Sequence, residues 1–278
     1  MTQKSKNLIK DVCLYIVCIL IMVLSVTAVV KTYSKKKAAS TTETTTTEYN
    51  TSSAYYIVDP TADEPFHFWD GIEVSEEATT VVEEAELPDS HTIELDCIYQ
   101  NPELPSGCEA VALTMVLNYY GFSLDKTDIA DDYLIYSDDN FVMGFKGNPY
   151  KTGGGGAYAP SMTNTANRFF IEQQSELRAI NISGLELEEL YPFIAGNTPV
   201  MVWSTIDLKE PKPTGATYRY GDFEYRWVTN EHCVVLTGYD LTTNQLTIYD
   251  SLSGVVTCDI EDFKLIYDKM WKMAVIVQ

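Results

Sequence analysis

The chain has 278 residues, of which 40 are acidic and 19 basic, and its formal net charge is −21. A polyanion of this size repels the phosphate backbone, so nucleic acid is excluded as an expected partner. Hydrophobic residues make up 45% of the chain, which is enough for a folded core.

The first candidate element is a run of 19 residues without a charged side chain, residues 12–30, flanked by lysines on both sides. As a helix it would be about 28 Å long, close to the ~30 Å hydrocarbon core of a bilayer. Since the apolar core of a signal peptide is usually shorter, we expect an uncleaved single-pass anchor. Residues 1–11 would then be cytoplasmic and the rest extracellular. Cleavage after Ala28, with secretion of the protein, is the alternative.

A Thr-rich, acidic linker follows over residues 31–90. Its low-complexity part, residues 38–53, consists mainly of Thr, Ser and Glu and cannot bury enough apolar surface to fold. We interpret the linker as a stalk between the membrane segment and a folded domain over residues 91–278.

The domain is organised around an apolar run that follows Cys108. Prolines and Gly107 interrupt regular structure before it, and residues 110–120 then predict a helix that is buried on nearly every side, ended by Gly121. Cys108 would lie in the first turn, where free N–H groups favour a thiolate, so we expect a lowered thiol pKa and a nucleophile. A small core residue that happens to be cysteine is the alternative.

The remaining elements predict an α+β domain, with helices first and an antiparallel sheet after them. The Gly run at 153–156 lacks the residues of a phosphate loop and predicts a mobile loop. The expected helices are 127–134, 161–170, 185–195 and 260–270, and the expected strands are 93–98, 200–203, 218–227, 231–240, 246–250 and 274–277.

A base for Cys108 has to be His232, because His67 and His91 fall in the irregular region that precedes the first predicted strand of the domain. His232 begins one predicted strand and Asp250 ends the next. A hairpin places these two ends together, so Asp250 could orient the imidazole as the third member of a catalytic triad.

The six cysteines contain no Cys-x-x-Cys pair, and no paired histidines accompany them, so we expect no metal and no cofactor. Cys233 alternates with His232 along the strand, which favours a core position for its side chain.

Several motifs, taken in order, resemble the exported peptidase-family-39-like cysteine peptidases of Gram-positive bacteria. These have the papain-like fold and are related to the double-glycine bacteriocin-processing peptidases. The resemblance covers residues 93–278. One departure is Ser251 after Asp250, where the family usually has proline. The motifs are Gln100 with Leu104-Pro105-Ser106-Gly107-Cys108-Glu109, then Gly147-Asn148-Pro149-Tyr150, Ala157-Tyr158-Ala159-Pro160, Thr198-Pro199-Val200-Met201-Val202-Trp203, and Glu231-His232-Cys233-Val234-Val235-Leu236-Thr237-Gly238-Tyr239-Asp240.

The resemblance implies a cysteine peptidase in which Cys108 is the nucleophile, His232 the general base and Asp250 its orienter. Gln100 would complete the oxyanion hole with the backbone N–H of Cys108. The expected partner is a peptide or protein substrate. A cell-wall peptidoglycan amidase or endopeptidase with the same site is one alternative, and a catalytically inactive peptide- or wall-binding module is another.

Overall fold

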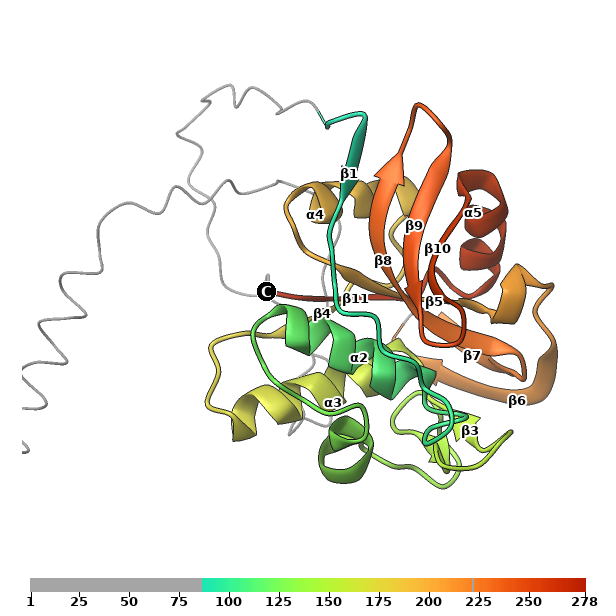
Figure 1. Ribbon diagram of the computed structural model, residues 1–278. Helices are drawn as coiled ribbons and strands as arrows, with labels where there is room; N and C mark the ends of the chain where they lie inside the picture. The colour runs from blue at the N-terminus through green and yellow to red at the C-terminus, as the bar shows by residue number, and fades with distance from the viewer. Residues whose placement is uncertain (1–86, 222) are drawn as a thin grey trace, which may run out of the picture. The chain divides into compact units, whose positions relative to one another are not determined.

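The computed structural model describes residues 87–221 and 223–278 (Figure 1). The predicted anchor and nearly all of the predicted stalk therefore lie outside the described residues. Within those two described ranges, no helix has both the length and the apolar character that a membrane span needs.

The core of the domain is a seven-stranded sheet in which six strands follow the order β10-β9-β8-β5-β11-β4 and β1 pairs with the far end of β8. All of these pairs are antiparallel. The strands are β1 (Ser90–Thr92), β4 (Ala179–Asn181), β5 (Val200–Thr205), β8 (Glu231–Asp240), β9 (Gln245–Asp250), β10 (Gly254–Asp259) and β11 (Ala274–Val277).

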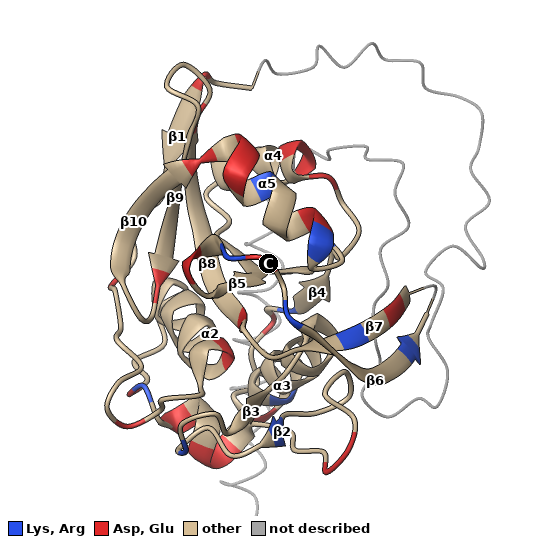
Figure 2. Cartoon of the chain, turned by 90° about the vertical axis from the view of Figure 1, so that its right-hand side faces the viewer, with Lys and Arg blue, Asp and Glu red and all other residues tan. Residues whose placement is uncertain are grey.

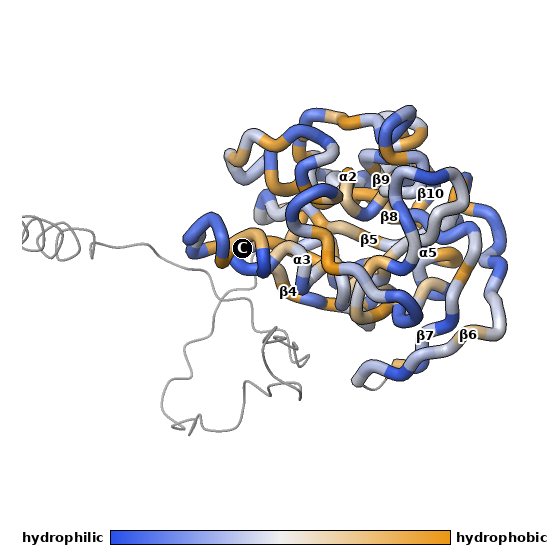
Figure 3. Tube along the Cα trace, turned by 90° about the horizontal axis from the view of Figure 1, so that it is seen from below, coloured by the Kyte–Doolittle hydropathy of each residue, from blue (hydrophilic) through white to orange (hydrophobic). Residues whose placement is uncertain are grey.

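Helices cover both faces of the sheet (Figure 1). Side chains alternate along β8, so that Cys233 and Val235 join one buried cluster and Val234 and Leu236 join the other. The first cluster includes α2 (Cys108–Tyr119) and α3 (Ala159–Glu172), and the second includes α4 (Tyr191–Ala195) and α5 (Ile260–Lys269). Apolar segments accordingly gather where the helices meet the sheet (Figure 3).

Helix α2 confirms the predicted central helix. Its first ten residues are all buried, which explains why its sequence is apolar on every side. Gly107 is the N-cap and provides no side-chain hydrogen bond, so the first N–H groups of the helix are not capped by a side chain. Gly121 ends the helix with φ +93°, a backbone conformation that glycine adopts without strain.

Two predicted strands were wrong. Residues 93–98 alternate in hydrophobicity but form no strand, and the pairing with the sheet lies just before them in β1. Residues 218–227 are not one strand but parts of a hairpin, β6 (Pro213–Tyr220) and β7 (Phe223–Val228), that turns at Gly221 with φ +56°. Strands β4 and β10 were not predicted.

The predicted helices at 161–170 and 260–270 are confirmed by α3 and α5. The helix predicted over 185–195 is instead a 3₁₀ turn, Leu187–Leu190, followed by the short α4. The helix predicted over 127–134 shortens to a π-helical turn, Ile129–Tyr133.

The glycine run was predicted as a mobile loop, and this is wrong for its second half. Gly155–Gly156 forms β3, which pairs with β2 (Lys146–Gly147). Gly154 is also held, because its N–H donates to Ser106 Oγ over 2.9 Å. The run is glycine-rich because the chain passes too close to its neighbours for a Cβ atom: a Cβ on Gly155 would come within 1.6 Å of the Lys146 carbonyl oxygen.

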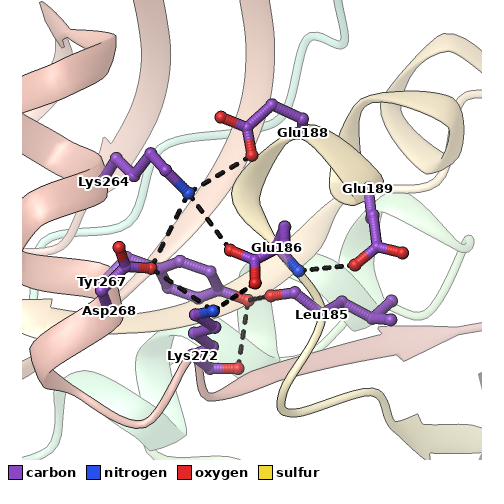
Figure 4. Close-up of polar contacts among 8 residues, drawn as sticks. All are labelled: Leu185, Glu186, Glu188, Glu189, Lys264, Tyr267, Asp268 and Lys272. Atoms are coloured by element: carbon purple, nitrogen blue, oxygen red, sulfur yellow. Dashed lines mark hydrogen bonds and ion pairs between the residues drawn. The ribbon is translucent and has the colours of Figure 1, made fainter.

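Helix α5 is tied to the 3₁₀ turn by charged and polar contacts (Figure 4). Lys264 Nζ lies 3.3 Å from carboxylate oxygens of both Glu186 and Glu188, and Lys272 Nζ lies 2.5 Å from Glu186. The buried hydroxyl of Tyr267 lies within hydrogen-bond distance of the Leu185 carbonyl oxygen. Along the ribbon of α5, positions coloured blue for lysine lie between positions coloured red for Asp and Glu (Figure 2). Exposed pairs of this kind contribute little each, so the apolar face of α5 carries most of the attachment.

Candidate active site

Cys108 is the first residue of α2, and only 6% of its surface is exposed. Its thiol donates a hydrogen bond to Glu109 Oε2, with 3.3 Å between sulfur and oxygen. The Cys108 sulfur lies within 4.8 Å of a carboxyl oxygen of Glu231, and the nearby backbone N–H of Cys233 favours the thiolate form. The sulfur therefore lies against β8, next to the residue that directly follows His232.

His232 and Asp250 form a buried pair at the ends of β8 and β9. His232 Nε2 lies 2.7 Å from Asp250 Oδ1, and the two residues are 3% and 9% exposed. The Leu252 N–H donates to the same carboxylate oxygen over 2.7 Å. With the proton on Nε2, the imidazole donates to Asp250 and leaves Nδ1 free to accept a proton.

The pKa of Asp250 reflects this pairing. Burial by itself raises the pKa, but the hydrogen bond and charge of His232, together with the N–H of Leu252, outweigh it and lower the pKa below its usual value. Asp250 is therefore an anion at neutral pH.

Gln100 lies beside the same end of β9 and is 2% exposed. Its Nε2 donates to the Pro105 carbonyl over 3.1 Å, and its Oε1 accepts a hydrogen bond of 2.6 Å from Ser251 Oγ. The Gln100 backbone N–H also donates to the Ser251 carbonyl. Ser251, the residue that departs from the family pattern, thus fixes the orientation of the Gln100 amide. Because Ser251 directly follows Asp250, Gln100 is held beside the His232–Asp250 pair.

The expected low pKa of the Cys108 thiol is wrong for this state of the protein. Burial, followed by repulsion from Glu109, raises the pKa of the thiol well above its usual value. The N–H of Cys233 lowers the pKa of the thiol, but by less than the other causes raise it. The helix N-terminus was visible in the sequence, whereas the two buried carboxyl groups beside the sulfur were not.

Glu109 and Glu231 are the residues near this site that sequence reasoning missed. They are 0% and 8% exposed, and their carboxyl groups are close enough to interact through a hydrogen bond. Each is the direct chain neighbour of a predicted catalytic residue, Cys108 or His232, and that adjacency was the signal available in the sequence.

The side chains of Cys108, Glu109 and Glu231 also bring together atoms of the kinds that bind metal ions. The ligand atoms of Cys108, Glu109 and Glu231 lie within 4.8 Å of one another. Both oxygens of Glu109 already accept hydrogen bonds from protein donors, Ala157 N–H and the thiol. The Glu109 carboxylate is thus already held by hydrogen bonds from the protein.

The four cysteines of the described residues, Cys97, Cys108, Cys233 and Cys258, are free thiols. Cys233 is fully buried in the cluster that contains α2, which confirms its predicted core position. Cys97 is partly exposed, and burial followed by the charge of Asp250 raises the pKa of its thiol.

A sulfur at a helix N-terminus, a His–Asp pair on adjacent antiparallel strands and a fixed glutamine, carried on a mixed α/β fold, define a domain of the cysteine-peptidase class. Residues 92–275 match the model of the Peptidase_C39 like family, so this chain belongs to that family.

The chain is also similar to two bacterial proteins. A crystal structure from Bacillus anthracis, of a protein described as a candidate C39-like peptidase, aligns with a TM-score of 0.57 at 26% identity, covering 68% of this chain and 97% of that one. The uncharacterized protein YvpB of Bacillus subtilis (strain 168) is 29% identical over 161 residues, which cover 52% of this chain. That match spans only 60% of the length of YvpB.

A further solved structure is that of a double glycine motif protease from an AMS/PCAT transporter in complex with the leader peptide. It aligns at 18% identity with a TM-score of 0.40, covering 67% of this chain and 93% of that one.

Proposed function

We propose that this protein is a cysteine peptidase that hydrolyses peptide bonds, with Cys108 as nucleophile, His232 as general base and acid, and Asp250 as the group that orients His232. The observation that carries the proposal is the meeting of α2 with β8. The Cys108 sulfur lies within 4.8 Å of a carboxyl oxygen of Glu231, the residue before His232, and the imidazole is held by an ionised carboxylate.

In the proposed reaction the thiol proton passes to His232 Nδ1, and the thiolate attacks the carbonyl carbon of the scissile bond. The oxyanion that forms accepts hydrogen bonds from Gln100 Nε2 and the Cys108 N–H. When the tetrahedral intermediate collapses, the C–N bond breaks and His232 protonates the leaving amine. Water, deprotonated by His232, then cleaves the thioester and restores the thiol.

The hydrogen bond from the thiol to Glu109 describes a resting state. In that state the Cys108 thiol holds its proton, so catalysis needs transfer of the proton to His232 once substrate is bound. Substrate that displaces water from the site would strengthen the attraction between thiolate and imidazolium, which favours the transfer.

We also propose that the domain is displayed outside the cell on a single-pass anchor formed by residues 12–30. The supporting observation is the 19-residue uncharged run in the sequence. Protease added to intact cells should release the domain. Protection of the domain until the cells are lysed would overturn this assignment.

The activity is tested by incubating the purified full chain with a peptide library and, separately, with purified cell wall. Cys108→Ala and His232→Ala should abolish cleavage, whereas Cys258→Ala, a substitution of a free cysteine in β10, serves as the matched control. Cleavage of cell wall alone would assign a peptidoglycan substrate. Cleavage of neither, together with specific retention of a peptide or of cell wall, would favour a binding module and contradict the proposed peptidase.

A further inference from the structure

Two buried acidic side chains flank the proposed catalytic residues. Glu109 follows Cys108 on α2, and Glu231 precedes His232 on β8. A carboxyl oxygen of one lies within 4.8 Å of a carboxyl oxygen of the other, close enough for the two groups to interact through a hydrogen bond, and both residues are buried away from water. Two carboxylates cannot donate to one another, so this contact requires a proton on one of them.

The hydrogen bonds show which group carries the proton. Glu109 Oε1 accepts from the Ala157 N–H over 2.5 Å, and Glu109 Oε2 accepts from the Cys108 thiol. Both oxygens of Glu109 therefore act as acceptors, as expected for a carboxylate. Glu231 Oε2 has no hydrogen-bond partner among the described residues. An ionised Glu231 would leave that buried charge unsolvated, so the neutral acid is the member that fits.

Strand β3 closes over the pair. A Cβ atom on Gly156 would come within 2.3 Å of Glu231 Oε1 and 2.6 Å of Glu109 Oε1. Three segments that are distant in sequence, namely the start of α2, the end of β3 and the start of β8, thus meet at the two carboxyl groups.

We propose that Glu109 and Glu231 share a single proton and act as positioning residues, fixing the first turn of α2 to the start of β8 and so holding the Cys108 sulfur beside the strand of His232. This inference rests on the proposed function, because the positioning has a purpose only if Cys108 and His232 react together. The pair itself does not depend on proteolysis.

The groups that face the pair come from each element packed against it. They are the thiol of Cys108 on α2, His232 and the thiol of Cys233 on β8, and the Tyr158 hydroxyl at the start of α3. Burial raises the pKa of both thiols and of the hydroxyl, so these three groups are neutral at neutral pH. The shared proton therefore limits the charge of the pair to one negative unit.

A proton retained by the folded state makes stability depend on pH. Burial, followed by repulsion from Glu109, raises the pKa of Glu231 well above its usual value. The unfolded chain loses this proton above roughly pH 4.3, while the folded chain keeps it. The stability that the proton provides is fully present below that pH and is lost as the pH rises toward the folded-state pKa. Glutamine cannot titrate, so Glu231→Gln should flatten this slope.

The test compares the full chain with Glu231→Gln, which keeps a neutral donor, and Glu231→Met, which has a similar length but no donor. Glu210→Gln, at an exposed surface carboxylate, is the control. The infrared carbonyl band of a protonated, buried carboxyl group should be present in wild type and control and absent from both Glu231 variants. The midpoint of thermal unfolding should fall more steeply with rising pH in wild type than in Glu231→Gln.

A third measurement separates positioning from simple structural support. The rate of Cys108 alkylation by iodoacetamide, followed by mass spectrometry on folded protein, should be about tenfold lower in Glu231→Met than in Glu231→Gln. That is the size expected when an ionised group loses a hydrogen bond. A carboxyl band that survives Glu231→Gln would overturn the shared proton. Equal alkylation rates in two folded variants would overturn the positioning role, while loss of cleavage in Cys108→Ala would still support the peptidase.

Discussion

His232 Nε2 and Asp250 Oδ1 lie 2.7 Å apart on adjacent antiparallel strands, and both residues are almost entirely buried. In the register of β8 and β9, Val235 lies opposite Tyr249. His232 and Asp250 therefore lie at the same end of the hairpin, the end away from its connecting turn. An imidazole held in this way has one tautomer and one orientation, which general acid–base catalysis requires.

Replacing Asp250 with asparagine should lower turnover by roughly 10²-fold or more, because the amide neither stabilises imidazolium nor fixes the tautomer. Peptide hydrolysis by the purified variant measures the effect. Asp268→Asn, a partly exposed substitution on α5, is the control. Wild-type turnover in Asp250→Asn would exclude Asp250 as the orienting residue.

Asp250 should also contribute to stability in acid. Its pKa is lowered in the folded state despite burial, chiefly through the hydrogen bond with His232. Its contribution is therefore present above the unfolded pKa of about 3.9 and is lost as the pH falls through the lower folded value. Thermal unfolding of wild type should weaken between about pH 4 and pH 2 more steeply than that of Asp250→Asn. Parallel curves would show that the pair adds no stability.

Replacing Gln100 with alanine should lower turnover by roughly 10²–10³, the usual effect of removing one oxyanion donor. Ser251→Ala should have a smaller effect in the same direction, because it frees Gln100 Oε1 without removing the Nε2 donor. Steady-state kinetics of both variants would show which substitution lowers turnover more. A larger effect from Ser251→Ala than from Gln100→Ala would contradict the assigned roles.

The Cys108 thiol of the protein without substrate should react slowly with iodoacetamide at neutral pH, and faster as the pH rises. Burial and the negative charge of Glu109 keep the thiol protonated. Glu109→Gln removes the negative charge beside the sulfur and should accelerate the reaction several-fold. Mass spectrometry of each cysteine peptide against pH measures this. Fast labelling with an apparent pKa below about 8.5 would restore the expectation drawn from the helix N-terminus.

Replacing Gly156 with alanine should destabilise the fold by about 1–3 kcal/mol, because the added Cβ overlaps two buried carboxyl oxygens. Urea unfolding of the two proteins gives the difference. Gly215→Ala is a matched control, since nothing lies within 4 Å of the position its Cβ would occupy. A variant at position 156 as stable as that control would mean that β3 does not press on the carboxyl pair.

Long, strongly patterned segments were predictable from the sequence. Helix α2 and the β8–β9 hairpin have continuous apolar patterns, and their ends located Cys108, His232 and Asp250. Strand β4 has only three residues and forms because β11 offers it an edge, so it has no pattern of its own. The β6–β7 hairpin was missed because the turn at Gly221 interrupts an otherwise strand-like run.

The chemistry of the site was less predictable than its location. A glutamate next to a cysteine suggests an exposed charge on a helix, and only the packing of α2 against β8 shows that Glu109 and Glu231 are buried together. Burial then reverses the effect that the helix N-terminus suggests for the Cys108 thiol. Sequence patterns describe neighbours along one element, whereas desolvation depends on all the elements that close around a group.

Strand β11 is paired on both sides, with β5 on one side and β4 on the other. Ala274–Val277 therefore completes the interior of the sheet, and its two neighbours were synthesised long before it. The domain cannot reach its native state on the ribosome until residue 277 has emerged from the exit tunnel. Until then the open slot between β5 and β4 exposes unpaired strand edges, where a chaperone or a second nascent chain could bind.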